Sequence, residues 1–226
     1  MAQPTAITAS VPEQRLTMTY EEFLDWTGNE GAHGEWVDGE VIVFMPSTIY
    51  HARALAFLVT LLSLYVRHFG LGEVLASSVH MRVRGGRSSR EPDLFFVADR
   101  HRDRVLATRL EGPADLVVEF VSDDSVARDR EAKFAEYAAV GVPEYWIHHP
   151  RPGRWRSDFY RLATDGQYEP IPPDVDGRIR SPVLPGFWLR PAWLLADPLP
   201  DPLGCLAEIA PGVWQTPRRG PRASGE

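Results

Sequence analysis

The segment from residue 115 to residue 148 constrains the fold more than any other part of the sequence. It begins with the apolar run DLVVEFV, continues with a stretch of helical periodicity that Gly141 and Pro143 follow, and ends with EYWIH. A continuous apolar run is typical of a strand buried on both faces, and Gly followed by Pro is a helix stop signal. The order strand–helix–strand predicts a parallel pair of strands in a mixed sheet.

The remaining segments predict further elements around this pair. Thr19 and Glu22 form a capping-box pattern for a short helix, and Asp38-Gly39 predicts a two-residue hairpin that joins residues 35–37 to residues 40–45. Apolar residues at helical spacing, closed by Gly70, predict a long helix. This long helix is expected at residues 50–69. The other expected elements are strands at 74–83 and 93–98, a helix or loop at 100–110, a helix at 124–140, and a closing hairpin from 156–162 and 167–171.

Length and composition favour one globular domain. We expect a flexible N-terminus over residues 1–15, the domain over residues 16–197, and a Pro- and Gly-rich tail over residues 198–226 that is disordered in part. The net charge of -7 argues against a nonspecific nucleic-acid coat protein, although an enzyme can still touch DNA locally. A single cysteine, Cys205, excludes internal disulfides and cysteine-based zinc sites.

The sequence also bears on location. The first residues lack the basic start and apolar run of a signal peptide. The most apolar stretch, residues 54–66, is too short to span a membrane and runs into Arg67 and His68. We therefore expect a cytoplasmic protein with no membrane association.

Two carboxylates on neighbouring predicted strands stand out. Glu119 lies inside the apolar run between Val118 and Phe120, where an unpaired charge costs several kcal/mol. It is therefore expected to bind a metal, to form a salt bridge, or to lie at the open end of the strand. Asp93 follows Pro92 at the start of the neighbouring strand. Together, the two carboxylates could hold a hard divalent cation.

Lys133 is the only lysine among the 24 Lys and Arg residues. At helical spacing its neighbours are Val126, Tyr137 and Val140, so it lies near the buried stripe of its helix. A helix packed on the sheet would turn this ammonium towards the carboxylates, although a lysine that snorkels at the helix edge has the same spacing. Glu35, on the first strand of the hairpin, is either a further carboxylate ligand or an ordinary polar strand residue.

Several weaker candidates accompany these four residues. His51 starts the long helix and either contacts substrate or caps the helix, whereas His148 and His149 lack partners at zinc spacing and are interpreted as structural. Two groups of arginines could touch phosphates or form a charged solvated surface, and the surface interpretation is favoured for most of them. These are Arg82, Arg84, Arg87 and Arg90 in one stretch, and Arg100, Arg102 and Arg104 in another.

The segments EPDLFFV, DLVVEFVSDDS and KFAEYAAVGVPEYWIHHP, with GEWVDGEV before them and SPVLPGFWLRPAWLL after them, carry a resemblance. Over about residues 17–195 the chain resembles the Uma-two family of restriction-endonuclease-like proteins, within the PD-(D/E)XK nuclease superfamily. The resemblance implies an α/β (α+β mixed) fold, a restriction-endonuclease-like αβββαβ core whose mixed β-sheet is flanked by helices.

The resemblance also implies roles for particular residues. Asp93 and Glu119 would bind Mg²⁺, with Mn²⁺ as a substitute, and Glu35 matches the upstream acidic position of the family. The standard superfamily pattern places a lysine where this chain has Val121, but the family moves that lysine to the following helix, where Lys133 fits.

The expected function is therefore that of a Mg²⁺-dependent endonuclease that hydrolyses phosphodiester bonds in DNA. Asp93, Glu119 and Glu35 would hold the metal, with Glu35 as an auxiliary ligand or water-orienting group. Lys133 would position the nucleophile or stabilise the transition state. The alternatives are a catalytically inactive binding module with the nuclease fold, and a metal-dependent phosphoesterase that acts on RNA. Cutting both strands of a duplex would favour a homodimer.

Overall fold

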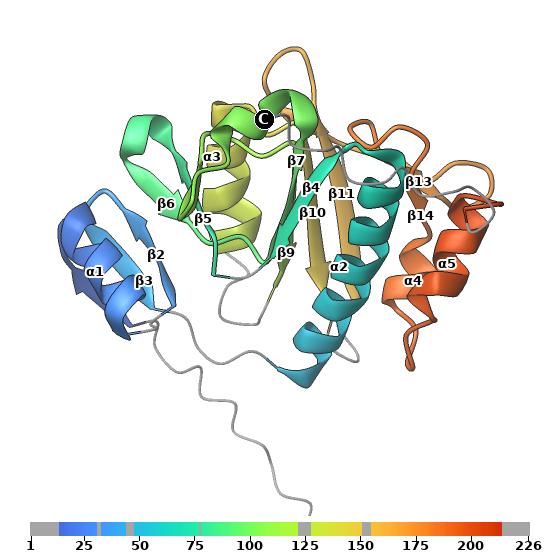
Figure 1. Cartoon of the computed structure of the whole chain (residues 1–226), viewed down its shortest axis with the longest axis horizontal. Helices are drawn as coiled ribbons and strands as arrows, with labels where there is room; N and C mark the ends of the chain where they lie inside the picture. The colour runs from blue at the N-terminus through green and yellow to red at the C-terminus, as the bar shows by residue number, and fades with distance from the viewer. Residues whose placement is uncertain are drawn as a thin grey trace, which may run out of the picture.

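A six-stranded mixed sheet forms the centre of the protein. The computed structural model describes residues 14–30, 33–43, 48–76, 78–121, 128–150 and 155–213 (Figure 1). The strand order of the central sheet is β12-β11-β10-β9-β7-β4, in which β9 and β10 are parallel and the other neighbours are antiparallel. The strands are β4 (Gly72–Ala76), β7 (Leu94–Ala98), β9 (Leu116–Phe120), β10 (Glu144–His149), β11 (Arg156–Leu162) and β12 (Tyr168–Pro170).

Helices cover both faces of this sheet (Figure 1). Side chains alternate along each strand, so Leu94 and Val118 pack beneath α2 (Ile49–Phe69), whereas Phe95 and Val117 pack on the side of α3 (Lys133–Val140). Buried residues of α4 (Pro191–Leu194) and α5 (Pro202–Ile209) join the core on the α2 side. This burial on two faces explains why every residue of β9 except Glu119 is apolar.

A second sheet lies beside the α3 face and has the strand order β1-β3-β2-β6-β5-β8. It contributes Glu35 and Arg90 to the interior, because both side chains are buried. Its elements are β1 (Arg15–Thr17), α1 (Tyr20–Glu30), β2 (Gly34–Val37), β3 (Glu40–Val43), β5 (His80–Val83), β6 (Ser88–Arg90) and β8 (Arg109–Glu111). The remaining elements are β13 (Ile179–Arg180), β14 (Trp188–Leu189) and the short helical turns η1 (Arg84–Gly86), η2 (Asp99–Arg104) and η3 (Arg128–Ala132).

The local signals in the sequence are confirmed where they are strongest. The Glu22 carboxylate accepts hydrogen bonds from the backbone N–H (2.7 Å) and hydroxyl (3.0 Å) of Thr19, which is the predicted capping box. Asp38 and Gly39 both have positive φ and join β2 to β3, as a two-residue hairpin requires. Gly70 ends α2 in the left-handed conformation. The parallel pair of β9 and β10 and the closing hairpin of β11 and β12 are also confirmed.

Two predicted elements differ in the structure. The single strand expected over residues 74–83 is wrong, because the chain forms β4 in the central sheet and β5 in the second sheet. Ser78, between them, has a φ of 59°, which breaks an extended run. Residues 100–110, expected as a helix or a loop, form η2 and the start of β8. The hairpin end at residue 45, the helix start at residue 124, and both chain termini lie outside the described residues.

Two further expectations change at the scale of a whole segment. Residues beyond 197 do not all form a loose tail, since α5 buries Cys205, Leu206 and Ile209 in the core. The expectation that the most apolar stretch is too short to span a membrane is also wrong. Within the described part of the chain, α2 has the length and composition for it. Seven of its side chains are buried within the protein, as in an ordinary core helix.

Candidate active site

The Lys133 ammonium connects two predicted site residues. It lies 2.8 Å from Glu35 Oε1 and donates a hydrogen bond of 2.9 Å to Glu119 Oε1. All three side chains are buried, with Lys133 2% exposed. Glu119 comes from β9, Glu35 from β2 and Lys133 from the first residue of α3, so both sheets and a helix converge here. The snorkelling lysine and the ordinary polar strand residue considered for Lys133 and Glu35 do not describe this arrangement.

Arg90 extends the same network. Its guanidinium donates to Glu35 Oε2 at 3.0 Å and, through Nε, to Glu136 Oε2 at 2.9 Å. Burial opposes the charged form of Arg90, but Glu35 and Glu136 outweigh it, so the pKa of Arg90 is raised. Glu35 therefore has one oxygen on Lys133 and the other on Arg90. The protein itself thus engages both oxygens of the residue that was predicted as an auxiliary metal ligand.

Tyr137 lies one helical turn beyond Lys133 and donates its hydroxyl hydrogen to Glu119 Oε1 at 2.9 Å. Burial, followed by the negative charges of Glu119 and Glu35, raises the pKa of Tyr137 well above its usual value. The phenol therefore stays protonated and serves as a fixed donor. One oxygen of Glu119 thus receives two hydrogen bonds from α3, which fixes the orientation of its carboxylate.

Asp93 stands next to this network but makes different contacts. The pairing of Leu94 with Val118 places Asp93 and Glu119 one step further along the antiparallel ladder of β7 and β9. Asp93 Oδ2 accepts a hydrogen bond of 2.7 Å from the backbone N–H of Phe120, and Oδ1 lies 3.1 Å from His51 Nε2. The Asp93 side chain is 25% exposed, so it is the most accessible of the four predicted residues.

The ends of α2 and β10 complete the surroundings of Asp93. The imidazole of His51 packs on Phe120 with ring centroids 5.3 Å apart, and Phe120 meets His148 edge-on at 5.7 Å. His148 Nδ1 lies 2.7 Å from Ser157 Oγ, and burial lowers the pKa of His148 to about 4. His148 is therefore neutral near pH 7 and packs as part of the interior, in line with its structural interpretation.

The chemistry of the donor set can be compared with the needs of Mg²⁺. Asp93 and Glu119 offer two hard carboxylates at the same end of adjacent strands, and Mg²⁺ is commonly held by one or two carboxylates with water in its remaining positions. Within the described ranges, no three His, Cys, Asp or Glu side chains form a group that could hold a metal ion. The donors therefore fit a hydrated cation on Asp93 and Glu119, rather than a closed cage that includes Glu35.

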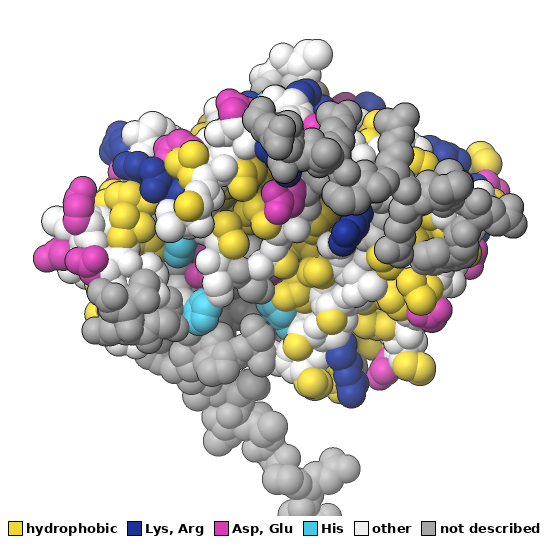
Figure 2. Space-filling view, viewed as in Figure 1, with side chains coloured by type: hydrophobic (Ala, Val, Ile, Leu, Met, Phe, Trp, Pro, Cys, Tyr) yellow, Lys and Arg dark blue, Asp and Glu magenta, His cyan; other side chains and the backbone are white. Residues whose placement is uncertain are grey.

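Val121 and most of the arginines serve the structure. Val121, at the standard lysine position, is buried, and its N–H donates to the His148 carbonyl oxygen at 2.8 Å. Besides Arg90, five of the seven arginines considered as phosphate contacts form ion pairs with carboxylates, which agrees with the favoured surface interpretation: Arg84 with Asp38, Arg87 with Asp38, Arg82 with Glu111, Arg100 with Asp115 and Arg102 with Asp99. On the face seen in Figure 2, the Lys and Arg side chains form separate groups interspersed with acidic ones.

Arg90, Glu136 and Tyr137 are the network members whose roles sequence reasoning missed. In the sequence, Arg90 falls in one stretch with the arginines expected at the surface, and Tyr137 marks only the apolar or aromatic side of the helix near Lys133. The available signal was the spacing of Lys133, Glu136 and Tyr137, which places all three on one helix face. The signal does not reveal Arg90, because its contacts to Glu35 and Glu136 join residues 55 and 46 positions apart.

The fold and the arrangement of these side chains are those of a nuclease-like protein. A mixed sheet carries two carboxylates at the same end of neighbouring strands, and the following helix carries a buried lysine, as the sequence resemblance to PD-(D/E)XK nucleases implied. The model of the Uma2 family, described as "Putative restriction endonuclease", matches residues 20–192. The chain therefore belongs to the Uma2 family, which confirms the resemblance.

A solved structure agrees at the level of the fold. The chain is similar to a crystal structure of a "putative nuclease belonging to DUF820" from Anabaena variabilis, with a TM-score of 0.58 and 15% sequence identity. The match covers 73% of this chain and 90% of that one. A search among curated proteins found no significant match. The expected nuclease-like fold is thus confirmed, and family and fold together support a nuclease.

Proposed function

We propose that the protein is a Mg²⁺-dependent endonuclease that hydrolyses phosphodiester bonds in DNA, with its reaction centre at Asp93, Glu119 and Lys133. The observation that carries the proposal is the buried Lys133 ammonium on Glu119 Oε1, beside the partly exposed Asp93 carboxylate. The family description as a restriction endonuclease favours DNA as the substrate.

The buried network gives Lys133 a fixed position. A lysine in the interior needs opposite charges to remain ionised, and Glu35 and Glu119 supply them at 2.8 and 2.9 Å. Glu35 is itself held by Arg90 at 3.0 Å, so it serves to position the ammonium. A compact positive charge held in this way can orient an attacking water or stabilise negative charge that develops on a phosphate oxygen.

Asp93 and Glu119 are the proposed metal ligands. When bound, Mg²⁺ supplies charge neutralisation at the phosphate and makes water a stronger acid. The backbone N–H of Phe120 holds one oxygen of Asp93, while Lys133 and Tyr137 hold one oxygen of Glu119. These contacts orient both carboxylates before any ligand arrives, and such preorganisation lowers the cost of assembling the site.

The test is cleavage of plasmid and linear DNA with and without Mg²⁺, using the wild type and the variants Asp93→Asn, Glu119→Gln and Lys133→Met. Each variant should lose at least about 100-fold in rate, the usual scale for removing a group that stabilises charge in the transition state. A parallel RNA substrate separates the two nucleic acids.

Asp93→Asn is the most informative variant. Its amide oxygen can still accept from Phe120 N–H and its amide nitrogen can still meet His51, so the fold should survive the loss of charge. The matched control is Glu73→Gln, at an exposed glutamate of β4, which should cleave at the wild-type rate. Unchanged Mg²⁺-dependent cleavage in folded Asp93→Asn, preferential cleavage of RNA, or no cleavage by the wild type would overturn the proposal.

A further inference from the structure

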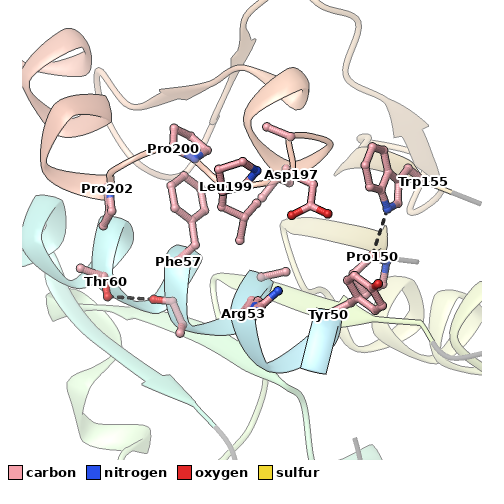
Figure 3. A pocket seen from close by; sticks show the side chains of 15 residues that line it. Tyr50, Arg53, Phe57, Thr60, Pro150, Trp155, Asp197, Leu199, Pro200 and Pro202 are labelled. Carbon is pink, nitrogen blue, oxygen red and sulfur yellow. Dashed lines mark hydrogen bonds between the residues drawn. The ribbon is translucent and has the colours of Figure 1, made fainter. Parts of the chain in front are cut away.

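A cavity of about 460 Å³ lies between α2 and the segment that leads into α5 (Figure 3). Its floor is the stripe of α2 that includes Tyr50, Arg53 and Phe57, which recur at helical spacing. The opposite wall comes from Asp197, Leu199 and neighbouring prolines, and Trp155 and Pro150 line one end. The volume is within the range of about 300–1,000 Å³ that is usual for small-molecule sites.

The cavity is apolar with two charged groups of opposite sign. Arg53 comes from α2 and Asp197 from the facing segment, and Figure 3 shows both in the space between the two walls. Among the described residues, neither side chain has an ion pair or hydrogen bond. Trp155 is 38% exposed, and its indole N–H donates to the Pro150 carbonyl oxygen at 3.1 Å, which fixes the orientation of the ring. Tyr50 adds a second partly exposed ring.

The cavity borders the proposed reaction centre along two elements. On α2, Tyr50 lines the cavity and the next residue, His51, contacts Asp93. On β10, His148 stands opposite Phe120, and Pro150, two residues further on, lines the cavity. The rings of His51, Phe120 and His148 contact one another in turn, with centroid distances of 5.3 and 5.7 Å, and so link the two elements. A nucleotide next to the phosphate at Asp93 could therefore reach the cavity.

We propose that this cavity binds one unpaired nucleobase of the nucleic-acid strand, with the adjoining phosphate on Arg53. The inference rests on the proposed function for the identity of the strand. Tyr50 and Trp155 offer faces on which a base can stack, and Asp197 can accept hydrogen bonds from the amino group of a base. Arg53 supplies the charge that complements a phosphate. The cavity thus selects a flat aromatic group that carries an anion.

The probe is 2-aminopurine deoxyribonucleoside monophosphate, whose fluorescence is quenched when its base stacks. Titration in EDTA measures binding without any metal or cleavage. The wild type should quench the probe in a saturable manner, and Trp155→Ala and Arg53→Met should each weaken binding by at least about 5-fold, the low end for loss of one stacking partner. Trp155→Phe, which keeps an aromatic face, should retain most of the affinity.

The matched control is Arg67→Met, which removes an exposed arginine near the other end of the same helix and should bind like the wild type. Deoxyribose 5-phosphate, which has a phosphate for Arg53 but no base, should displace the probe only at concentrations at least about 5-fold above those at which deoxyadenosine monophosphate displaces it. Displacement by both compounds at the same concentration, or equal binding by the wild type and the Trp155→Ala variant, would overturn the inference.

The binding test and the cleavage test can contradict the base pocket and the proposed nuclease separately. Asp93→Asn should quench the probe like the wild type while it loses cleavage, because Asp93 does not line the cavity. Cleavage of DNA by a wild type that does not quench the probe would sink the base pocket and leave the proposed nuclease standing. Quenching that depends on Trp155 and Arg53, without any DNA cleavage, would support the pocket and sink the nuclease.

Discussion

Arg90 shows how one buried residue holds a site without belonging to its reacting groups. Its guanidinium forms hydrogen bonds with Glu35 from its own sheet and with Glu136 from α3. Since Glu35 also contacts Lys133, the position of the lysine depends on a charge that lies behind it. Planar guanidinium suits this role better than ammonium, because it donates to two carboxylates at once in a fixed geometry.

Arg90→Met should lower the free energy of unfolding by about 3–5 kcal/mol, because it removes the positive charge that meets the buried Glu136 carboxylate and one oxygen of Glu35. The control is Arg87→Met, three residues earlier, whose partner Asp38 is on the surface. That exposed pair should be worth less than about 1 kcal/mol. Urea denaturation of both variants measures the difference. Equal stabilities for the two variants would contradict the structural role of Arg90.

At this scale the sequence predicted which residues carry charge into the interior better than it predicted their partners. Glu119 stood out because a carboxylate interrupts an apolar strand, and Lys133 because it lies on an apolar helix face. Glu35 could not be distinguished from a solvated strand residue, since alternation along a hairpin does not show which face another sheet covers. The contact of Glu35 with Lys133 depends on how the two sheets meet, and no local pattern encodes that.

At the scale of elements, β10 carries a buried carboxylate, that of Glu144, which lies outside the candidate site. Glu144 is fully buried and accepts hydrogen bonds from Trp146 Nε1 at 2.6 Å and from Ser181 Oγ at 2.5 Å. Burial raises the pKa of Glu144 to about 7, although these two hydrogen bonds oppose the shift. The strand thus retains a protonated carboxyl group at pH values where an exposed glutamate is ionised.

This shift predicts a dependence of stability on pH. Below pH 4.5 the carboxyl is protonated in both the folded and the unfolded chain, and between pH 4.5 and about 7 only the folded chain keeps the proton. The contribution of Glu144 to stability should therefore fall as pH rises through this window, by on the order of 3 kcal/mol, and stay low above it.

Glu144→Gln removes the titration, and its amide can still accept from Trp146 and meet Ser181. The difference in free energy of unfolding between wild type and variant, measured from pH 4.5 to pH 8, should shift steadily in favour of the variant. Glu73→Gln, at an exposed carboxylate, should give a flat difference. A flat difference for Glu144→Gln as well would show that Glu144 ionises in the folded protein much as it does in the unfolded chain.

The strand–helix–strand core was predictable because its signals are local. DLVVEFV, the Gly141 stop and EYWIH each indicate one element, and the handedness of the crossover leaves few arrangements. The boundary between β4 and β5 was not predictable, since apolar residues occur on both sides of Ser78 and the break shows in the backbone at Ser78. Two short strands that follow closely in the sequence resemble one long strand, even when they belong to different sheets, as β4 and β5 do.

At the scale of the whole molecule, the C-terminal segment closes the core on the α2 side. Pro-rich composition after residue 197 resembles a tail, yet Asp201 caps α5 by accepting from the backbone N–H groups of Leu203 and Gly204. On α5, the buried residues Cys205, Leu206 and Ile209 belong to the same core cluster as α2. The same segment forms one wall of the cavity proposed to hold a base.

A chain that ends at residue 197 should therefore fail to form a stable fold, whereas a chain that ends at residue 213 should retain the wild-type stability. The shorter chain loses the buried side chains of Leu206, Ile209 and Val213, each worth about 1.5–3 kcal/mol, and exposes the face of α2 that they cover. That sum is comparable to the whole stability of a typical domain, about 5–15 kcal/mol. Urea denaturation of both purified chains measures the difference. A cooperative transition at the wild-type midpoint for the chain that ends at residue 197 would mean that α5 rests on the surface of a domain that is complete without it.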